Sequence, residues 1–414
     1  MTETVLLVGG GGREHAIARA VDESDEAELY ACASNRNPGI ADLAAGFREH
    51  AETDTDAIVE YAESVGATLA VIGPETALEA GVADALDAAG VYAFGPRAEA
   101  ARIETDKAFQ REFMTEHSIP GCPDYETFED PEAAADYLRS YDGHLAIKPR
   151  GLTGGKGVRV TGDQLTVAEG VEYVLESDYE AYVLEERLVG EEFTIQAFVA
   201  EGQYRVSPAV QDHKRAYEGD EGPNTGGMGS YSDATFELPF MTEADYTEAV
   251  EIIDSIEGPK VVEFNARFGD PEAMNTLPVL ETDFVSLLVA AREGEELPEL
   301  EFADRATVCK YAVPDGYPTD PTAGAKVEID ADSSGDALSF YASVDAREDG
   351  IYTTTSRSFA VVGLADTITE AEAVAEDALE RAGEEGLRVR HDIGTAELLQ
   401  ARIDYMQELR TDPR

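Results

Sequence analysis

Lysine is scarce in this chain, and two of its seven lysines border or enter one glycine-rich stretch. Lys148 ends the apolar run HLAIK, and Lys156 lies within GLTGGKGVRV, residues 151–160. A glycine-rich backbone can approach phosphate oxygens closely, and ammonium groups supply the opposite charge. The stretch is not a Walker A loop, because Arg150 stands at its first glycine position and Gly157 follows the lysine. We therefore predict a phosphate-covering glycine hairpin, with a plain β-turn as the alternative.

Two acidic stretches could complete a nucleotide and metal site. In VLEERLVGEEFTI, residues 183–195, an acidic strand end could bind an adenine amino group and a carboxylate could hold ribose hydroxyls. In KVVEFNARFGDPE, residues 260–272, we expect a strand with Glu263, Asn265 and Arg267 on one face. Carboxylate and amide oxygens suit Mg²⁺ or Mn²⁺, and an arginine can stabilise a phosphoryl group in transfer. An exposed polar face is the alternative.

The pattern of elements predicts three domains of α/β and α+β class. Residues 1–105 alternate apolar runs with amphipathic stretches, which predicts a doubly wound parallel sheet that binds ligands at the carboxyl ends of its strands. Residues 106–308 are rich in strands and glycine loops, and residues 309–414 combine strands with the helical run AEAVAEDALERAGEE. The motifs above all fall in the central domain.

Charge is the most unusual property of the composition. The chain has 86 acidic and 31 basic residues and a formal net charge of −55. Such a surface repels nucleic acid and anionic membranes, and it suits a cytoplasm of molar salt, where the Debye length is about 3 Å. It resembles the surfaces of halophilic proteins; an acidic protein with a cationic partner is the alternative. Three scattered cysteines and the lack of a long apolar run favour a reducing, cytoplasmic location.

Eight motifs together resemble one family. In chain order they are LLVGGGGREHAIA, IGPE, FGP, TDKAF, QDHKR, GPNTGGMG, EFNARFGDPE and RHDIG. They resemble, over essentially the whole chain, the phosphoribosylamine–glycine ligases of the ATP-grasp superfamily. A dinucleotide-binding interpretation of the first motif fails because Glu14 replaces the last glycine. The resemblance implies a central ATP-grasp fold with a mobile lid at about residues 121–190, and a C-terminal α+β domain.

The resemblance also implies an activity. Glycine would be activated by ATP as glycyl phosphate and then joined to 5-phosphoribosylamine, giving glycinamide ribonucleotide, ADP and phosphate in purine biosynthesis. ATP would be a substrate and Mg²⁺ or Mn²⁺ the metal. The partners would be these small molecules, with no nucleic acid and no membrane, and the resemblance favours a monomer.

Particular residues receive roles from the same resemblance. The nucleotide-binding set is Lys107, Lys148, Gly154, Gly155, Lys156, Gly157, Glu185, Glu186, Leu188 and Glu192. Within it Glu185, Glu186 and Leu188 would hold adenine and Glu192 the ribose, with an ordinary exposed glutamate as the alternative for Glu192. The metal ligands would be Glu263 and Asn265. The binding set for sugar and glycine is Gly10, Gly11, Gly12, Glu75, Asp212, Lys214, Asn224, Thr225, Gly226, Gly227, Met228 and Arg267.

The reacting centre would contain Arg267, Asp270 and Lys156. His15 and His213 could equally be structural, so neither is assigned as a general base. Arg390 could assist from the C-terminal domain.

Two places depart from the family pattern. The stretch from Ile256 to Lys260 leads almost directly into VVEFN, where the family has a further strand, so we expect an unpaired strand edge beside the metal. The segment TSRSF, residues 355–359, replaces a glycine-rich family segment. The alternatives are therefore a nucleotide-binding homologue impaired by the shortened segment, or another ATP-grasp amine ligase.

The net charge predicts a salt-dependent stability. With few counterions the acidic surface repels itself, so the melting temperature should fall as KCl is lowered from molar to millimolar concentration. Thermal unfolding across a KCl series measures this. An unchanged melting temperature would contradict it.

Overall fold

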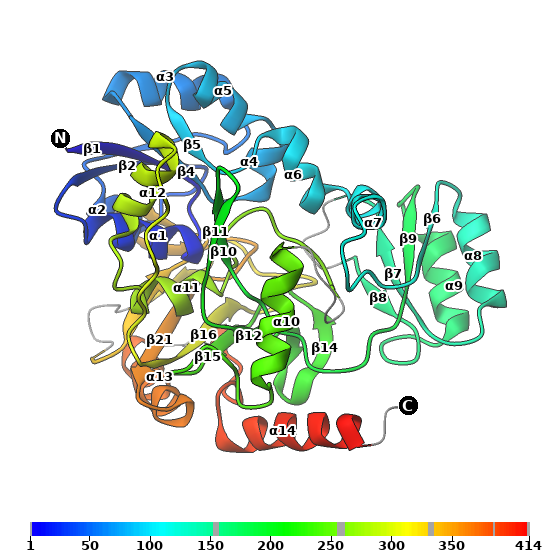
Figure 1. Ribbon diagram of the computed structural model, residues 1–414. Coiled ribbons are helices and arrows are strands. Elements are labelled where there is room, and N and C mark those ends of the chain that lie inside the picture. The colour runs from blue at the N-terminus through cyan, green and yellow to red at the C-terminus, as the bar shows by residue number, and fades with distance from the viewer. Residues whose placement is uncertain (1, 152–156, 255–260, 330–334, 384–385, 412–414) are drawn as a thin grey trace.

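The computed structural model describes residues 2–151, 157–254, 261–329, 335–383 and 386–411. The chain begins in a layered α/β domain, continues into a small subdomain that projects from one side, and ends in helix α14 (Ala396–Thr411) along the base of the molecule (Figure 1). In the described ranges, no helix is long and apolar enough to cross a membrane.

The N-terminal domain is built on a five-stranded parallel sheet in the order β3-β2-β1-β4-β5. Its central strands are almost wholly buried, as their continuous apolar sequence requires. This confirms the predicted doubly wound sheet. The strands are β1 (Glu3–Val8), β2 (Ala27–Ala33), β3 (Gly46–Glu49), β4 (Leu69–Ile72) and β5 (Tyr92–Phe94). The helices are α1 (Gly12–Asp22), α2 (Pro38–Leu43), α3 (Thr55–Val65), α4 (Glu75–Glu79), α5 (Val82–Ala88) and α6 (Ala98–Thr105).

The projecting subdomain has an antiparallel sheet of its own, in the order β6-β9-β7-β8, covered by two helices that bury a separate apolar cluster. Helix α7 (Lys107–Glu116) leads into it (Figure 1). It lies within the predicted lid, whose movement remains a prediction. Its elements are β6 (Tyr125–Phe128), α8 (Pro131–Ser140), β7 (Leu145–Pro149), β8 (Arg159–Val160), α9 (Val167–Glu176) and β9 (Tyr182–Glu186).

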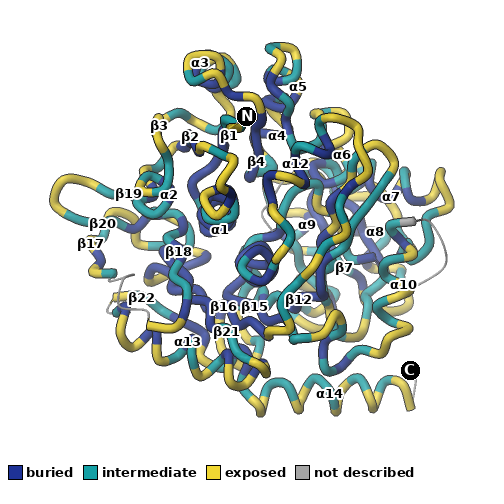
Figure 2. Tube along the Cα trace, turned by 60° about the vertical axis from the view of Figure 1, so that its left-hand side comes forward, coloured by how far each residue is buried: buried dark blue, intermediate teal, exposed yellow. Residues whose placement is uncertain are grey.

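A further antiparallel sheet joins the central and C-terminal parts of the chain. Its order is β12-β15-β16-β21-β18, with β22 beside β16. All nine residues of β16 are buried, and helix α13 covers β21 (Figure 2). The predicted boundary at 308/309 falls inside β16. The strands are β12 (Val210–Asp212), β15 (Gly229–Ser232), β16 (Ala306–Pro314), β18 (Leu338–Tyr341), β21 (Phe359–Ala365) and β22 (Leu387–Arg388), and the helix is α13 (Ile368–Ala382).

Shorter elements complete the fold. The hairpin strands are β10 (Ala197–Ala200), β11 (Gln203–Val206), β13 (Arg215–Tyr217), β14 (Glu221–Asn224), β17 (Lys326–Val327), β19 (Val344–Arg347) and β20 (Gly350–Thr353). The helices are η1 (Glu218–Asp220), α10 (Glu243–Asp254), α11 (Ala273–Thr276), η2 (Leu277–Val279) and α12 (Phe284–Glu293).

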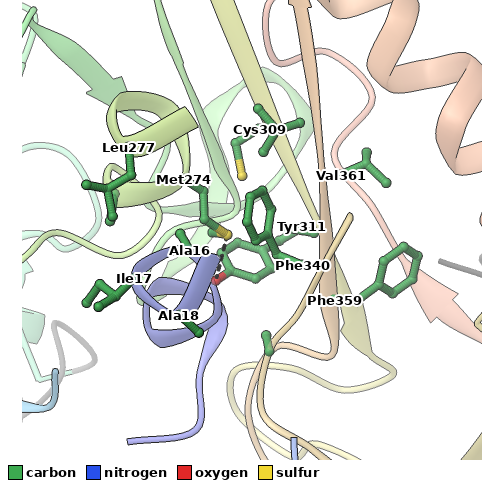
Figure 3. Packing of buried hydrophobic residues seen from close by; sticks show 14 of the residues in the cluster. Ala16, Ile17, Ala18, Met274, Leu277, Cys309, Tyr311, Phe340, Phe359 and Val361 are labelled. Carbon is green, nitrogen blue, oxygen red and sulfur yellow. Dashed lines mark hydrogen bonds between the residues drawn. The ribbon is translucent and has the colours of Figure 1, made fainter. Parts of the chain in front are cut away.

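The largest apolar core lies where these layers meet. Helix α1 packs beside α11 and β18, and Ile17, Met274, Tyr311 and Phe340 share one cluster (Figure 3). The Tyr311 hydroxyl faces the Met274 sulfur at 4.0 Å. The N-terminal domain, the central region and the C-terminal sheet therefore share one core.

The predicted strand at residues 260–268 is wrong over its described part. Residues 261–268 belong to no strand. A strand needs a neighbour to complete its ladder, and this segment has no paired strand among the described residues. Because residues 261–268 form no strand, the described structure contains no strand edge beside Glu263, and the expected unpaired edge is not observed.

Charged contacts fasten helix α14 and the segment before it to the central region. Arg390 Nη1 lies 2.8 Å from Asp220 Oδ1, and Arg402 of α14 also pairs with Asp220. Burial raises the pKa of Asp220, but Arg402 and Arg390 outweigh burial and lower it to about 2. The ionised Asp220 therefore stabilises the folded state.

The variant Asp220→Asn should have a lower melting temperature than the wild type at neutral pH. The difference should shrink as pH falls from the ordinary value of 3.8 towards about 2, because a carboxylate with a lowered folded-state pKa loses its contribution on protonation. Thermal unfolding over that pH range in molar KCl tests this. The matched control is Asp377→Asn, which removes a half-exposed pair with Arg381; a pH-independent difference for Asp220→Asn would contradict the assignment.

Candidate active site

A buried carboxylate joins two cations where the projecting subdomain meets helix α7. Lys148 lies on β7 and Glu185 on the neighbouring strand β9, with 2.7 Å between Nζ and Oε2. Arg111 of α7 donates from Nε and Nη2 to the two oxygens of Glu185, both at 2.9 Å. Burial raises the pKa of Glu185, but Lys148 and Arg111 outweigh it and hold the pKa below its usual value. Glu185 therefore orients Lys148, and its contact with adenine remains a prediction.

Lys107 reaches the start of the glycine-rich stretch. It is the first residue of α7, and its Nζ donates to the Gly151 carbonyl at 2.7 Å. Burial lowers the pKa of Lys107. The predicted residues Gly154, Gly155 and Lys156 lie outside the described residues. Beyond them, the carbonyl of Gly157 accepts a hydrogen bond of 2.7 Å from the Tyr173 hydroxyl.

The predicted adenine hinge lies at the end of β9. Glu186 is its last residue, and its carboxylate accepts a hydrogen bond of 3.1 Å from the Asp124 backbone. Leu188 follows two residues later. These positions are on the route by which the chain leaves the subdomain, so the hinge would lie at its base.

Lys214 connects the predicted ribose carboxylate with the predicted metal carboxylate. It pairs with Glu192 and lies 3.8 Å from Glu263 Oε1. Burial lowers the pKa of Lys214, but Glu192 and Glu263 outweigh it and raise the pKa. Lys214 was predicted to bind sugar or glycine; the structure places it between two groups predicted for the nucleotide and the metal.

Glu263 and Asn265 fit a divalent cation by their chemistry. Burial raises the pKa of Glu263, but Lys214, Lys148 and other cations lower it to about 2, so the carboxylate is ionised at neutral pH. Its side chain is 42% exposed and can reach a ligand. The described ranges contain no group of three or more acidic, histidine or cysteine side chains able to hold a metal. Two protein oxygens with phosphate oxygens are enough for Mg²⁺.

Arg267 lies between two carboxylates of the N-terminal domain and its linker. Its Nη2 is 3.0 Å from Glu104 Oε1, and its Nε is 3.8 Å from Glu75 Oε2. Arg267 and Glu263 thus engage different partners. The guanidinium lies where the N-terminal sheet domain meets residues 261–269, the metal segment that carries Glu263 and Asn265. A substrate phosphate or acyl phosphate could reach it there.

Asp270 lies in a second buried cluster, with a cation from the C-terminal domain. Arg357 Nη2 is 2.7 Å from Asp270 Oδ2, and the Tyr311 hydroxyl donates to Oδ1 at 2.6 Å. The guanidinium stacks 4.5 Å from the Tyr311 ring centroid. Burial raises the pKa of Asp270, but Arg357 and Arg13 outweigh it and keep it low. Arg357 also donates to the Gly226 carbonyl at 2.5 Å and to Gly227 at 3.2 Å.

The loop of Asn224 to Met228 is ordered by its own hydrogen bonds. The Thr225 hydroxyl donates to the Lys214 carbonyl at 2.9 Å, and the Gly227 amide donates to that hydroxyl at 3.0 Å. Asn224 Oδ1 accepts from Gln164 at 3.2 Å, and Met228 is buried. Together with Arg357, these bonds bring the loop to Asp270.

Asp212 is half-buried, and one of its carboxylate oxygens is buried. Its Oδ1 lacks a hydrogen-bond partner among the described residues. Burial, followed by the nearby Glu272, raises the pKa of Asp212 well above its usual value. The neighbouring His213 and the distant His15 are also buried, and burial lowers the pKa of each to about 3. Both histidines are therefore neutral at physiological pH, and their roles remain open.

The glycine turn of residues 10–12 joins β1 to α1. The Gly11 amide donates to Glu14 Oε2 at 2.7 Å, and the Arg13 guanidinium lies beside that carboxylate. A side chain on Gly12 would collide with the Tyr311 hydroxyl. The turn thus approaches the Asp270 cluster, and phosphate binding there would share the helix N-terminus with Glu14.

Four site residues, three of them buried, were missed from the sequence. They are Arg111, Glu104, Tyr311 and Arg357. Arg357 lies in TSRSF, the segment that replaces a glycine-rich family segment. The scarcity of cations that singled out the lysines could also have singled out the arginines. Arg390, predicted to assist, is buried against Asp220 and Asp392 and supports β13 through the Arg215 carbonyl at 3.2 Å.

Three consecutive regions of the chain match models of one family. Residues 3–104 match "Phosphoribosylglycinamide synthetase, N domain", residues 105–256 match its "ATP-grasp (A) domain", and residues 307–396 match its "C domain". The phosphoribosylamine–glycine ligase of Methanosarcina barkeri is 48% identical over 435 aligned positions, covering 98% of this chain and 99% of that protein. The chain belongs to the phosphoribosylamine–glycine ligase family.

Other relatives agree in sequence and in fold. The phosphoribosylamine–glycine ligase of Methanoregula boonei is 48% identical over 98% of this chain and 100% of that protein. The crystal structure of the Thermotoga maritima phosphoribosylamine–glycine ligase has a TM-score of 0.78 at 24% identity, covering 94% of this chain and 99% of that one. The biotin carboxylase domain of Hydrogenobacter thermophilus 2-oxoglutarate carboxylase, solved with MgADP, has a TM-score of 0.72 at 15% identity, covering 98% of this chain and 94% of that one. These structures support the shared fold.

The alignment is consistent with a shortened segment. It runs over 435 positions, more than the 414 residues of this chain, so the Methanosarcina barkeri protein has residues that this chain lacks. The ATP-grasp match ends at residue 256, next to the departure identified in the sequence.

Removing the cation beside Asp270 should lower the stability of the fold. The variant Arg357→Leu leaves a buried carboxylate without its ion-pair partner, so we expect the free energy of unfolding to fall by about 3 kcal/mol. Adding Asp270→Asn should recover part of this loss. Denaturant unfolding in molar KCl measures both. The control Arg381→Leu, at a half-exposed pair, should cost less than about 1 kcal/mol; an equal loss for the two single variants would refute the expectation.

Proposed function

We propose that this chain joins glycine to 5-phosphoribosylamine with ATP, giving glycinamide ribonucleotide, ADP and phosphate, a step of purine biosynthesis. The observation that carries the proposal is the match to phosphoribosylamine–glycine ligases at 48% identity over nearly the whole of both chains. A full-length match of this kind favours this ligase over another ATP-grasp amine ligase. Catalytic loss through the shortened segment is the remaining alternative.

The nucleotide would lie between the projecting subdomain and the central region. Lys107 and Lys148 would contact its phosphates, because their ammonium groups lie beside the glycine-rich stretch and the metal segment respectively. Glu186 and Leu188 would contact adenine through their backbone, and Glu192 would bind ribose. Binding would then draw Lys148 towards the phosphates and leave Arg111 to neutralise Glu185.

Glu263 and Asn265 would hold Mg²⁺ or Mn²⁺ through their side-chain oxygens. A metal held there would supply positive charge that neutralises phosphate oxygens. The permanent negative charge on Glu263 supports this role, because its pKa of about 2 keeps it ionised at working pH.

The reaction would proceed in two displacements. A carboxylate oxygen of glycine attacks the γ-phosphorus, the bond to the β–γ bridging oxygen breaks, and ADP leaves. The phosphoribosylamine nitrogen then attacks the acyl carbon, the carbon–oxygen bond to phosphate breaks, and the amine gives up a proton. Phosphoryl transfer requires positioning and charge neutralisation rather than a protein nucleophile.

Arg267 and Asp270 would act at the reacting centre. Arg267 stabilises negative charge on the phosphoryl group, and its two carboxylate partners, Glu104 and Glu75, hold its direction. Asp270, held ionised by Arg357, would orient the amine of the substrate or of glycine. The loop of residues 224–228 would bind the sugar beside it.

The projecting subdomain would close over the nucleotide and exclude water from glycyl phosphate. Its separate sheet and separate apolar cluster support independent movement. The acidic surface supports activity in a salt-rich cytoplasm, and we expect the enzyme to work as a monomer.

Coupled ADP release in molar KCl tests the function. With Mg²⁺ present, ADP should be released when glycine and phosphoribosylamine are both supplied, and glycinamide ribonucleotide should form in equal amount. ATP binding without ADP release would indicate the impaired homologue instead. Release with other amines or carboxylates would indicate a different ligase.

The site assignment is tested by Lys148→Ala and Glu263→Ala in the same assay. We expect each variant to lose turnover, because one loses a phosphate-binding charge and the other a metal ligand. Circular dichroism should show a retained fold. Lys326→Ala is the control, since this lysine is exposed and its Nζ donates to the Asp349 carbonyl. Wild-type turnover in either site variant would contradict the assignment.

A further inference from the structure

The metal segment keeps its backbone hydrogen bonds although it pairs with no strand among the described residues. The Val262 carbonyl accepts from Arg111 Nη2 at 2.6 Å and from Lys148 Nζ at 3.0 Å. The Phe264 carbonyl accepts from Gln110 Nε2 at 3.2 Å, and the Ala266 amide donates to Glu104 Oε2 at 2.7 Å. Unsatisfied backbone groups are costly inside a protein, and here side chains satisfy them.

The spacing of these bonds is that of one edge of a strand. In an extended chain, the backbone groups of residues i, i+2 and i+4 point to the same edge, where a neighbouring strand would bind them. The held residues are Val262, Phe264 and Ala266. The residues between them are Glu263 and Asn265, the two proposed metal ligands.

Three of the four contributing side chains come from consecutive helices. Glu104 lies on α6, and Gln110 and Arg111 lie on α7. They are 9%, 3% and 0% exposed, although polar and charged side chains are rarely buried without partners. Their partners are the backbone of the metal segment, together with Arg267 for Glu104 and Glu185 for Arg111. In the described structure the Gln110 side chain makes one other hydrogen bond, from Nε2 to the Ile103 carbonyl at 2.5 Å.

We propose that Glu104, Gln110 and Arg111 are positioning residues that take the place of a neighbouring strand and thereby fix Glu263 and Asn265 for the metal. The helix side chains bind the backbone of residues 262–266, so these residues still present both ligands. The proposal rests on the metal assignment made above. On this proposal, the chain keeps both metal ligands in place although it lacks residues that its family has. Glu104, Gln110 and Arg111 do this from buried positions near the junction of the first two domains.

Gln110 offers the cleanest test, because it touches neither Arg267 nor Glu185 in the described contacts. Gln110→Leu keeps the size of the side chain and removes the donor to Phe264. The matched control is Gln203→Leu, which removes a side-chain bond to the Glu295 carbonyl far along the chain. Affinity for Mn²⁺ at saturating ADP is measured by electron paramagnetic resonance in molar KCl, and hydrogen exchange is followed across residues 261–269.

We expect Gln110→Leu to weaken Mn²⁺ binding about tenfold, the effect of losing one well-placed hydrogen bond. The KM for Mn²⁺ should rise more than kcat falls, ADP affinity in EDTA should stay unchanged, and exchange in residues 261–269 should quicken. Gln203→Leu should behave as the wild type. Wild-type Mn²⁺ affinity in Gln110→Leu, or equal weakening in both variants, would overturn the proposal.

Glu263→Ala separates this proposal from the one on which it rests. If Glu263→Ala loses Mn²⁺ binding while Gln110→Leu retains it, the metal assignment stands and the positioning role is overturned. If Glu263→Ala binds Mn²⁺ normally, the metal assignment itself fails, and with it the link from Gln110 to the metal.

Discussion

The carboxylate of Glu185 is the interaction on which the proposed nucleotide site depends. Two buried cations share it, and each cation also binds the Val262 carbonyl, so one anion joins α7, β7, β9 and the metal segment. A buried carboxylate with one cation would leave charge uncompensated once that cation turned to a ligand. The second cation, Arg111, would leave Glu185 with a compensating charge if Lys148 turned to a phosphate as proposed.

Acidic and basic side chains are distributed differently between the surface and the interior, and this difference favours the candidate site. The surface is strongly acidic, whereas several cations, among them Arg111, Lys148 and Arg390, are buried in clusters around Glu185 and Asp220. Buried pairs are screened little by salt, while exposed charges are screened strongly. A high-salt medium therefore relieves repulsion at the surface without weakening the contacts that build the active centre.

The sequence alone predicted much of the fold and part of the site. Alternating apolar runs predicted the parallel sheet, because a buried strand such as β1 has a nearly continuous apolar sequence. Lys148 was singled out because lysine is rare and this one borders a glycine-rich stretch, whereas Lys107 was assigned from the family resemblance. Local pattern could not predict Arg111 or Arg357, whose partners lie 74 and 87 residues away. The expected strand around Glu263 was wrong because strand structure depends on a neighbour, which a local sequence does not contain.

The sheet that runs from β12 to β18 has a mechanical consequence. It carries Asp212 at the end of β12 and Tyr311 on β16, so strands from both sides of the predicted domain boundary share one hydrogen-bonded ladder. The C-terminal part is therefore held to the central region by the same ladder, and we expect the two to move as one body. In the proposed closure, rigid-body movement would be confined to the β6–β9 subdomain, whose strands pair only with one another in the described structure. That subdomain would then close against a single fixed body.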